Sequence, residues 1–146
     1  MEEIALGKYT LIEKLGQGSF GTVYKALDGI GHLVAVKILK PGWSDDPEAI
    51  ERFRREVLAG GSLFHPRIAT ILDIDEVEGW RLLVMRYVNS ASLDKVIADR
   101  GSLPWKEALD IISQVAEGLD YAYRQGFIHR DIKPANISSA RKRGRC

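Results

Sequence analysis

The sequence has a single cysteine, Cys146, and no apolar run long enough to cross a lipid bilayer. One cysteine excludes an internal disulfide framework and a cysteine-based metal cluster. The first residues, Met1-Glu2-Glu3, lack the basic start and apolar core of a secretion signal. A net charge of +1 gives no general attraction to nucleic acid or anionic membranes. These absences predict a cytoplasmic domain with no membrane segment and no nucleic-acid partner.

The composition is that of an ordinary globular domain: 146 residues, 45% of them hydrophobic and 28% charged. β-prone runs and turn residues fill the first third of the chain, and apolar residues at helical spacing follow. The predicted strands are 9–15, 22–26, 33–39, 68–74 and 81–88. The predicted helices are a segment beginning near Pro47, residues 93–99 and residues 105–125, the last ended by a cap at Gly126. Turns are predicted at residues 28–31 and around Glu78-Gly79. This pattern indicates an α+β fold with an antiparallel sheet.

A glycine-rich segment between the first two predicted strands is the first motif with a chemical meaning. Gly16, Gly18 and Gly21 follow the spacing Gly-x-Gly-x-x-Gly, in which backbone N–H groups can approach phosphates without hindrance from a Cβ. In dinucleotide-binding folds the same pattern must open a helix. Here it leads into a strand, which favours a hairpin over a nucleotide. A simple glycine-rich turn is the alternative.

The third predicted strand contains Val34-Ala35-Val36-Lys37. Alternation along a strand puts Ala35 and Lys37 on one face and the two valines on the other. A small residue and an ammonium group on one face suit an adenine and its phosphates, although a lysine at a strand end is usually a solvated charge. Glu56 lies three residues after Phe53, near the buried side of its predicted helix, and Lys37 is the cation available to it. Glu51 is the next candidate.

The segment from His129 to Asn136 carries three polar functions shortly after the long predicted helix. Asp131 can accept a hydroxyl proton, Lys133 can offset phosphate charge, and the amide oxygen of Asn136 can bind Mg²⁺. An ordinary surface loop is the alternative for this segment taken alone. Chance becomes a poor explanation when all four motifs occur in this order.

As an ordered set, these motifs resemble the protein kinase family, and most closely its bacterial serine/threonine members. The resemblance covers residues 8–137. It implies a kinase-like N-lobe, with five antiparallel strands and one helix, and a hinge within residues 9–88. Residues 89–137 would begin the C-lobe with its first helices and catalytic loop. The implied reaction is ATP-dependent phosphoryl transfer to protein serine or threonine hydroxyls.

The resemblance also implies a role for each matching residue. The implied catalytic residues are Asp131, Lys133, Lys37 and Glu56, with Asp131 as the base and Glu56 paired to Lys37. Asn136 would bind Mg²⁺. The residues implied to bind ATP are Leu15, Gly16, Gln17, Gly18, Ser19, Phe20, Gly21, Val23, Ala35, Lys37, Met85, Arg86 and Val88. Arg86 stands where the family usually has glutamate, which matters little to a contact made by the main chain.

The sequence departs from the family after Ile137. The family continues to an Asp-Phe-Gly motif whose aspartate binds magnesium, whereas residues 138–146 form a divergent basic tail. This difference predicts an N-terminal part of a kinase domain, with weak or absent catalysis by the chain alone. The alternative is an inactive kinase lobe that binds nucleotide or a partner. Uncovered apolar residues on the helix at 105–125 predict association, by dimerisation or with another kinase chain. These residues are Leu109, Ile112, Ala116, Leu119 and Tyr123.

Overall fold

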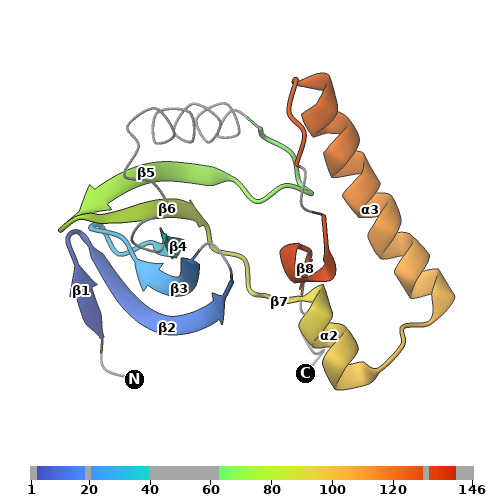
Figure 1. The fold of residues 1–146 in the computed structure, drawn as a ribbon, viewed down its shortest axis with the longest axis horizontal. Coiled ribbons are helices and arrows are strands. Elements are labelled where there is room, and N and C mark those ends of the chain that lie inside the picture. Colours follow the sequence, from blue (N-terminus) through green and yellow to red (C-terminus); the bar gives the residue numbers. More distant parts are fainter. Residues whose placement is uncertain (1–2, 19–20, 40–62, 130–131, 141–146) are drawn as a thin grey trace. The chain divides into compact units, whose positions relative to one another are not determined.

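The structure is a computed structural model that describes residues 3–18, 21–39, 63–129 and 132–140 (Figure 1). The chain forms two compact units. The first comprises residues 1–64 and 69–87, and the second comprises residues 65–68 and 88–146. The helix predicted near Pro47 lies outside the described residues, as does Glu56 within it.

The first unit is built on one antiparallel sheet with the strand order β1-β2-β3-β4-β6-β5. Its strands are β1 (Ile4–Leu6), β2 (Tyr9–Gln17), β3 (Gly21–Leu27), β4 (Leu33–Leu39), β5 (Ile71–Val77) and β6 (Trp80–Arg86). The α+β, kinase-like fold class predicted from the sequence is confirmed. All five predicted strands are present, and β1 is a sixth strand that the sequence does not predict.

The predicted strand at 68–74 is displaced in the structure, where β5 begins at Ile71. The reason is that Ile68 belongs to a turn, in which its N–H donates to the carbonyl of His65 at 3.1 Å. Pairing with β6 starts only at Ile71, opposite Met85. The displacement shows how strand ends depend on a pairing partner that local sequence does not identify.

Two turns form as the sequence predicts. Glu78 and Gly79 have φ angles of 52° and 81°, and they join the paired residues Val77 and Trp80 in a two-residue hairpin. Such hairpins need positive φ at both central positions, which glycine adopts readily. In the turn after β3, the side chain of Asp28 accepts a hydrogen bond from the N–H of Ile30 at 3.0 Å.

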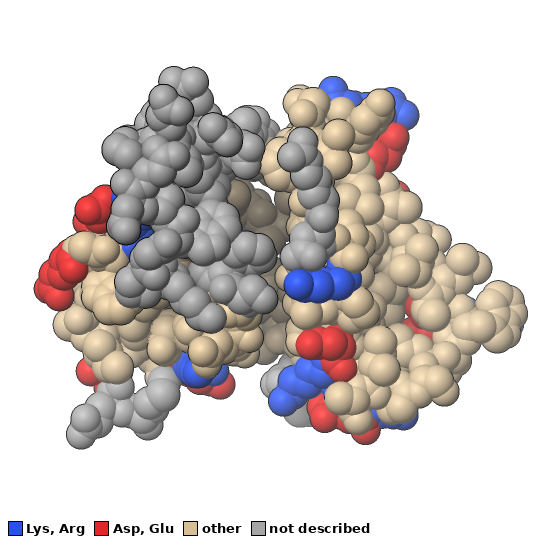
Figure 2. Space-filling view, viewed as in Figure 1, with Lys and Arg blue, Asp and Glu red and all other residues tan. Residues whose placement is uncertain are grey.

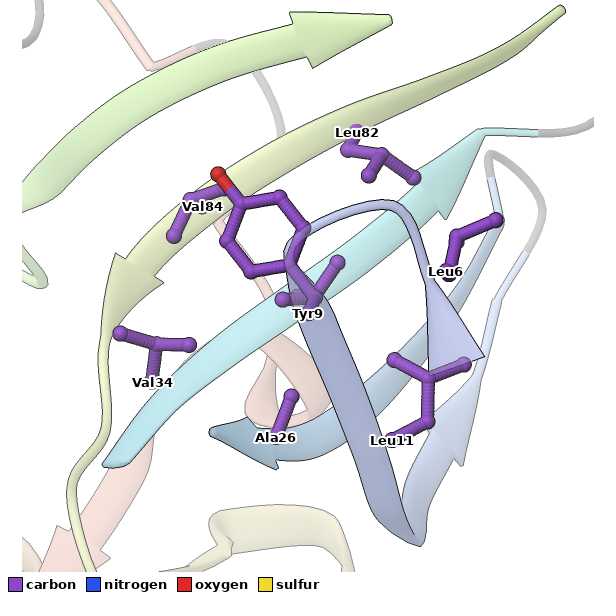
Figure 3. Close-up of a cluster of buried hydrophobic side chains, with 8 residues drawn as sticks. Leu6, Tyr9, Leu11, Ala26, Val34, Leu82 and Val84 are labelled. Carbon is purple, nitrogen blue, oxygen red and sulfur yellow. The ribbon is translucent and has the colours of Figure 1, made fainter. Parts of the chain in front are cut away.

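The hydrophobic core of the first unit lies against one face of the sheet (Figure 3). Strand alternation directs every second residue of β4 and β6 to this face. Tyr9 is 2% exposed and lies among aliphatic side chains from five strands. The buried cluster consists of Leu6, Tyr9, Leu11, Ala26, Val34, Val36, Leu82 and Val84.

Contacts between the turn after β1 and strand β5 close the sheet around this core, although β1 and β5 are its two edge strands. Lys8 Nζ lies 3.0 Å from Asp75 Oδ2, and the hydroxyl of Tyr9 donates to the same oxygen at 3.3 Å. The hydrogen bond from Lys8 lowers the pKa of Asp75. Burial of the phenol raises the pKa of Tyr9. The carboxylate thus holds two residues of β2 and its turn against the opposite edge of the sheet.

The second unit contains two helices and a short ladder. Its elements are β7 (Ser90–Ser92), α2 (Leu93–Arg100), α3 (Trp105–Arg124), the short 3₁₀ helix η1 (Pro134–Asn136) and β8 (Ser138–Ala140). The helix predicted at 105–125 is confirmed within one residue, and the helix at 93–99 is likewise confirmed. Arg100 and Glu107 join α2 to α3 by two hydrogen bonds of 2.7 and 2.9 Å. In the described part of the chain, no helix is long and apolar enough to cross a membrane.

The end of α3 forms a glycine cap at the residue that the sequence identifies. Gly126 has φ 83°, and its N–H donates to Tyr123 C=O at 2.9 Å. The N–H of Phe127 donates to Ala122 C=O, also at 2.9 Å. This pair of reversed hydrogen bonds satisfies carbonyls that the helix itself leaves without partners. The chain therefore leaves α3 in a defined direction toward the predicted catalytic loop.

Substitution of Gly7 should test the close approach of the β1–β2 turn to β5. Gly7 has φ +58°, and a Cβ there would lie 2.8 Å from Val77 Cγ1. Gly31, at φ +86° with no atom within 4 Å of such a Cβ, is the matched control. We expect Gly31→Ala to cost about 1–2 kcal/mol from backbone strain. Gly7→Ala should cost roughly 1–3 kcal/mol more from overpacking, measured by urea denaturation. Equal costs would show that the contact with Val77 is unimportant.

The ion pair of Lys8 and Asp75 should make stability depend on acid pH. Because the folded-state pKa of Asp75 is lowered, its contribution is present above the unfolded-state pKa and is lost as the pH falls. Lys8→Met should therefore reduce the free energy of unfolding at pH 7 more than at pH 3. Urea denaturation at both pH values measures this difference. Lys106→Met, on the exposed side of α3, is the control. An equal effect of Lys8→Met at both pH values would contradict the pairing.

Candidate nucleotide and catalytic-loop site

The glycine loop joins β2 to β3 in the first unit. Gly16 pairs with Val23 across the two strands, and Gly18 N–H donates to Gly21 C=O at 2.9 Å. The loop is therefore a hairpin that leads into a strand, as the sequence predicts. This geometry differs from the strand-to-helix turn of dinucleotide-binding folds.

The three glycines of this loop differ in what surrounds them. A Cβ at Gly21 would lie 2.1 Å from the carbonyl oxygen of Ile38 in β4, so packing of the sheet requires glycine there. A Cβ at Gly16 or Gly18 would meet no atom within 4 Å. Packing therefore explains Gly21 but not the other two, whose open backbone leaves room for a ligand.

Two further residues predicted to bind ATP lie beside the loop. Leu15 sits at a register shift of β2, and its side chain is 45% exposed. Gln17 ends β2, and its side-chain oxygen accepts a hydrogen bond from Lys14 Nζ at 2.8 Å. Ser19 and Phe20 lie outside the described residues, so their roles stay predictions.

Four predicted site residues share the face of the sheet opposite to the core. Val23 pairs with Lys37, and Lys37 pairs with Leu83, while Ala35 pairs with Met85. Directly opposed residues of an antiparallel pair point to one face, as do residues two apart along a strand. The sequence-based prediction that Ala35 and Lys37 share a face is confirmed. Strand pairing extends that face to Val23 and Met85.

The side chains on this face change from apolar to charged along β4. Ala35 is 8% exposed, and its side chain is a single methyl group. Lys37, two residues further on, is half-buried and lies between Val23 and Leu83 in the cross-strand register. A small apolar side chain and an ammonium group thus follow each other on one face of β4. The predicted pairing of Lys37 with Glu56 stays a prediction because Glu56 lies outside the described residues.

The predicted hinge follows β6. The N–H of Arg86 donates to the carbonyl of Thr70 at 2.8 Å. A ligand would therefore bind the carbonyl of Arg86 and not its N–H. The side chains of Arg86 and Val88 are exposed, and Met85 is half-buried. Between them, Tyr87 presents its ring to Lys25 Nζ, 5.3 Å from the ring centroid. The sequence gives no signal of this contact, because the two residues are far apart in the chain.

The predicted catalytic loop belongs to the second unit. Lys133 has an extended backbone and an exposed side chain, and η1 follows it directly. The N–H of Asn136 donates to the carbonyl of Lys133 at 2.9 Å, which fixes the spacing of these two residues. Asp131 lies outside the described residues. Its role as a base therefore stays a prediction.

A short ladder anchors the far end of this loop. In β8, Ser138 and Ala140 pair with Ser92 and Ser90 of β7. The N–H of Leu93 also donates to Ile137 C=O at 2.8 Å. Residues 138–146 are predicted from the sequence to be a divergent tail, but residues 138–140 form a strand. Three small residues give no periodic signal, so only the pairing shows it.

The side chain of Asn136 suits the magnesium ion that the resemblance implies. An amide oxygen such as that of Asn136, which is exposed, is a hard ligand of the kind that Mg²⁺ prefers. In the described part of the chain, no group of three or more His, Cys, Asp or Glu side chains is placed to hold a metal ion. A magnesium site here would therefore take further oxygen ligands from phosphates or from residues outside the described ranges.

Comparisons with known proteins match these features. The protein kinase domain family matches residues 9–144. The serine/threonine-protein kinase PknA of Mycobacterium tuberculosis is 42% identical over 137 residues, which cover 90% of this chain and 32% of PknA. The serine/threonine-protein kinase PrkC of Bacillus subtilis is 40% identical over 132 residues, covering 90% of this chain and 20% of PrkC.

A solved structure gives the same result for the fold. The crystal structure of the Mycobacterium tuberculosis PknI kinase domain superposes with a TM-score of 0.80 at 36% identity. The match covers 93% of this chain and 56% of the PknI chain. The chain thus spans about a fifth to a third of the two curated relatives and just over half of the solved kinase domain. It belongs to the protein kinase domain family, within which its relatives are bacterial serine/threonine kinases.

Proposed function

We propose that this chain supplies the nucleotide-binding part and the catalytic loop of an ATP-dependent serine/threonine protein kinase. The observation that carries the proposal is the sheet face shared by Val23, Ala35, Lys37 and Met85, beside the open backbone of the glycine loop. The proposed domain comprises residues 8–137, with the N-lobe and hinge at 9–88 and the start of the C-lobe at 89–137. We also propose that it acts in the cytoplasm on protein substrates.

The proposed nucleotide contacts follow from the chemistry of that face. Adenine packs against Val23 and Ala35. Its amino group donates a hydrogen bond to the carbonyl of Arg86, and a ring nitrogen accepts one from the N–H of Val88. The ammonium group of Lys37 attracts the phosphates, while the backbone N–H groups around Gly16 and Gly18 approach them. Glu56 holds Lys37 in position.

The proposed transfer step uses the loop of the second unit. The substrate hydroxyl oxygen bonds to the γ-phosphorus as the bond from that phosphorus to the β–γ bridging oxygen breaks. Asp131 accepts the hydroxyl proton, and Lys133 offsets charge on the transferred group. Asn136 holds Mg²⁺, which neutralises phosphate charge when bound.

A second candidate function is a nucleotide-binding or interaction module without catalysis. It is favoured because the chain spans 56% of the solved PknI kinase domain and contains no Asp-Phe-Gly sequence. Loss of one magnesium ligand removes a large part of the electrostatic stabilisation on which phosphoryl transfer depends. A nucleotide-binding module shares nucleotide binding with the kinase, whereas phosphoryl transfer distinguishes the two.

Alanine substitutions in the glycine loop should separate ligand binding from folding. Gly16→Ala has open space and should leave the free energy of unfolding within about 0.5 kcal/mol of the parent. It should weaken ATP binding roughly 3–10-fold, because the added Cβ would keep one backbone N–H from its hydrogen bond to a phosphate. Gly21→Ala meets the backbone of β4 and should destabilise the fold by roughly 1–3 kcal/mol. Urea denaturation and fluorescent-nucleotide titration measure both quantities. Unchanged ATP affinity in Gly16→Ala would count against the loop as the phosphate site.

Substitutions of charged site residues should separate the two candidate functions. Transfer of labelled γ-phosphate from Mg²⁺–ATP to a generic protein substrate is the measurement. If the chain is catalytic, Lys37→Met and Asp131→Asn should each lower the rate by roughly 10²–10⁴-fold. Lys37→Met should also weaken nucleotide binding, whereas Asp131→Asn should preserve it. Lys95→Met, at an exposed position of α2, is the control.

The outcomes of this experiment are distinct. Transfer that depends on Asp131 establishes catalysis by the chain. Nucleotide binding without transfer supports the interaction module instead. Absence of any nucleotide binding would refute the kinase and the nucleotide-binding module, and would leave only the interaction module.

A further inference from the structure

A second lysine lies on the sheet face that carries Ala35 and Lys37. Lys25, in β3, pairs with Ala35 in β4, and Ala35 in turn pairs with Met85 in β6. Directly opposed residues of an antiparallel pair point to one face, so these three side chains share the face proposed to bind nucleotide. That face therefore holds two ammonium groups, of which Lys25 has no part in the proposed phosphate contacts.

The two lysines lie at different places along the sheet. Lys37 pairs with Val23, and Lys25 follows Val23 by two residues along β3. Two residues of a strand span about 7 Å, so the two lysines occupy successive rows of the same face. The row of Lys25 contains Ala35, a proposed adenine contact, and leads toward the hinge. The row of Lys37 leads toward the glycine loop.

The ammonium group of Lys25 contacts the hinge. Lys25 Nζ lies 5.3 Å from the centroid of the Tyr87 ring, within the range of a cation–π interaction. Both side chains are half-buried, which strengthens the interaction because less water competes for the cation. Glu13, exposed and opposite Lys25 in the register of β2 and β3, is the alternative partner for the ammonium group.

Tyr87 stands between the two residues whose main chain is proposed to bind adenine. β6 ends at Arg86, so Tyr87 lies one residue beyond the strand pairing. The side chains of Arg86 and Val88 are exposed, whereas that of Tyr87 packs beneath Lys25. The contact with β3 thus fixes the residue that carries a peptide group of the hinge on each of its sides.

A general positive field is a poor explanation for a second lysine on this face. The net charge of the chain is +1. In Figure 2, on the part of the surface that the structure describes, basic and acidic side chains lie in small groups of both signs. Removal of one lysine should therefore change ligand binding through the contact that its side chain makes.

We propose that Lys25 is a positioning residue that holds the hinge through the ring of Tyr87 and thereby sets the affinity for the adenine part of the ligand. It acts on the carbonyl of Arg86 and the N–H of Val88, and it does not touch the phosphates. This inference rests on the proposed function, because these hinge groups matter only where adenine binds. A lysine that bound phosphate directly would affect ATP and leave adenosine unaffected.

Competition of adenosine and of ATP with a fluorescent nucleotide separates these two roles. Lys25→Met should weaken the binding of both ligands by the same factor, roughly 3–10-fold, through loss of the cation–π contact. Tyr87→Leu should have the same effect. Lys25→Arg and Tyr87→Phe keep a cation and a ring, so they should bind both ligands within about twofold of the parent chain. Lys37→Met should weaken the binding of ATP far more than that of adenosine, which shows that the assay detects a phosphate contact.

A double variant and two controls test the pairing itself. Lys25→Met combined with Tyr87→Leu should bind adenosine no more weakly than Tyr87→Leu alone, because the two residues act through one contact. The matched control is Lys106→Met, which removes a cation 5.5 Å from the ring centroid of Trp105 in α3. It should leave both affinities unchanged, as should Glu13→Gln. Circular dichroism and urea denaturation show whether each variant folds.

Equal weakening of adenosine and ATP binding in folded Lys25→Met, with recovery in Lys25→Arg, supports the proposal. Weakening of ATP binding alone overturns it, because Lys25 would then be a phosphate contact. Additive losses in the double variant, or unfolding of Lys25→Met, overturn it as well. If the parent chain binds neither ligand, the proposed nucleotide site fails and this inference fails with it. Normal binding by the parent chain and by Lys25→Met refutes this inference alone.

Discussion

The pairing of β4 with a strand on each side is the constraint on which the first unit depends. β4 pairs with β3 on one side and β6 on the other, so its backbone is held at both edges. Val34 and Val36 then enter the core, and Ala35 and Lys37 must point to the other face. A shift of one residue would bury the lysine and expose both valines. Core packing and the proposed ATP site are therefore set by a single register.

The curl of the sheet depends in turn on a contact between its edges. Asp75 binds Lys8 and Tyr9, and Gly7 allows the turn to approach Val77. Tyr9 is consequently enclosed by aliphatic side chains rather than by solvent. The opposite face, with its small and charged residues, remains for a ligand.

In the second unit, the predicted catalytic loop is held by the elements that precede and follow it. Gly126 ends α3, and the β7–β8 ladder holds the chain after η1, so the loop between them is fixed at both ends. Lys133 and Asn136 thus occupy a defined stretch of backbone, as groups that act on one substrate require.

Local sequence determined those features that arise within a few residues. The exact bounds of β4, the hairpin at Glu78-Gly79 and the cap at Gly126 were all predictable, because alternation, positive φ and the end of helical spacing act over short distances. The family assignment was predictable for a similar reason, since its motifs lie in order along the chain. Glu56 and Asp131 lie outside the described residues, so their roles rest on sequence alone.

Tertiary structure decided what depends on partners distant in the chain. β1 and β8 have three residues each and exist through pairing, and β5 begins where β6 can receive it. The different roles of Gly16 and Gly21 were also invisible in the sequence, because only β4 shows which glycine is packed against backbone. Each motif residue could be identified from the sequence. Strand register decided that four of them share one face, namely Val23, Ala35, Lys37 and Met85.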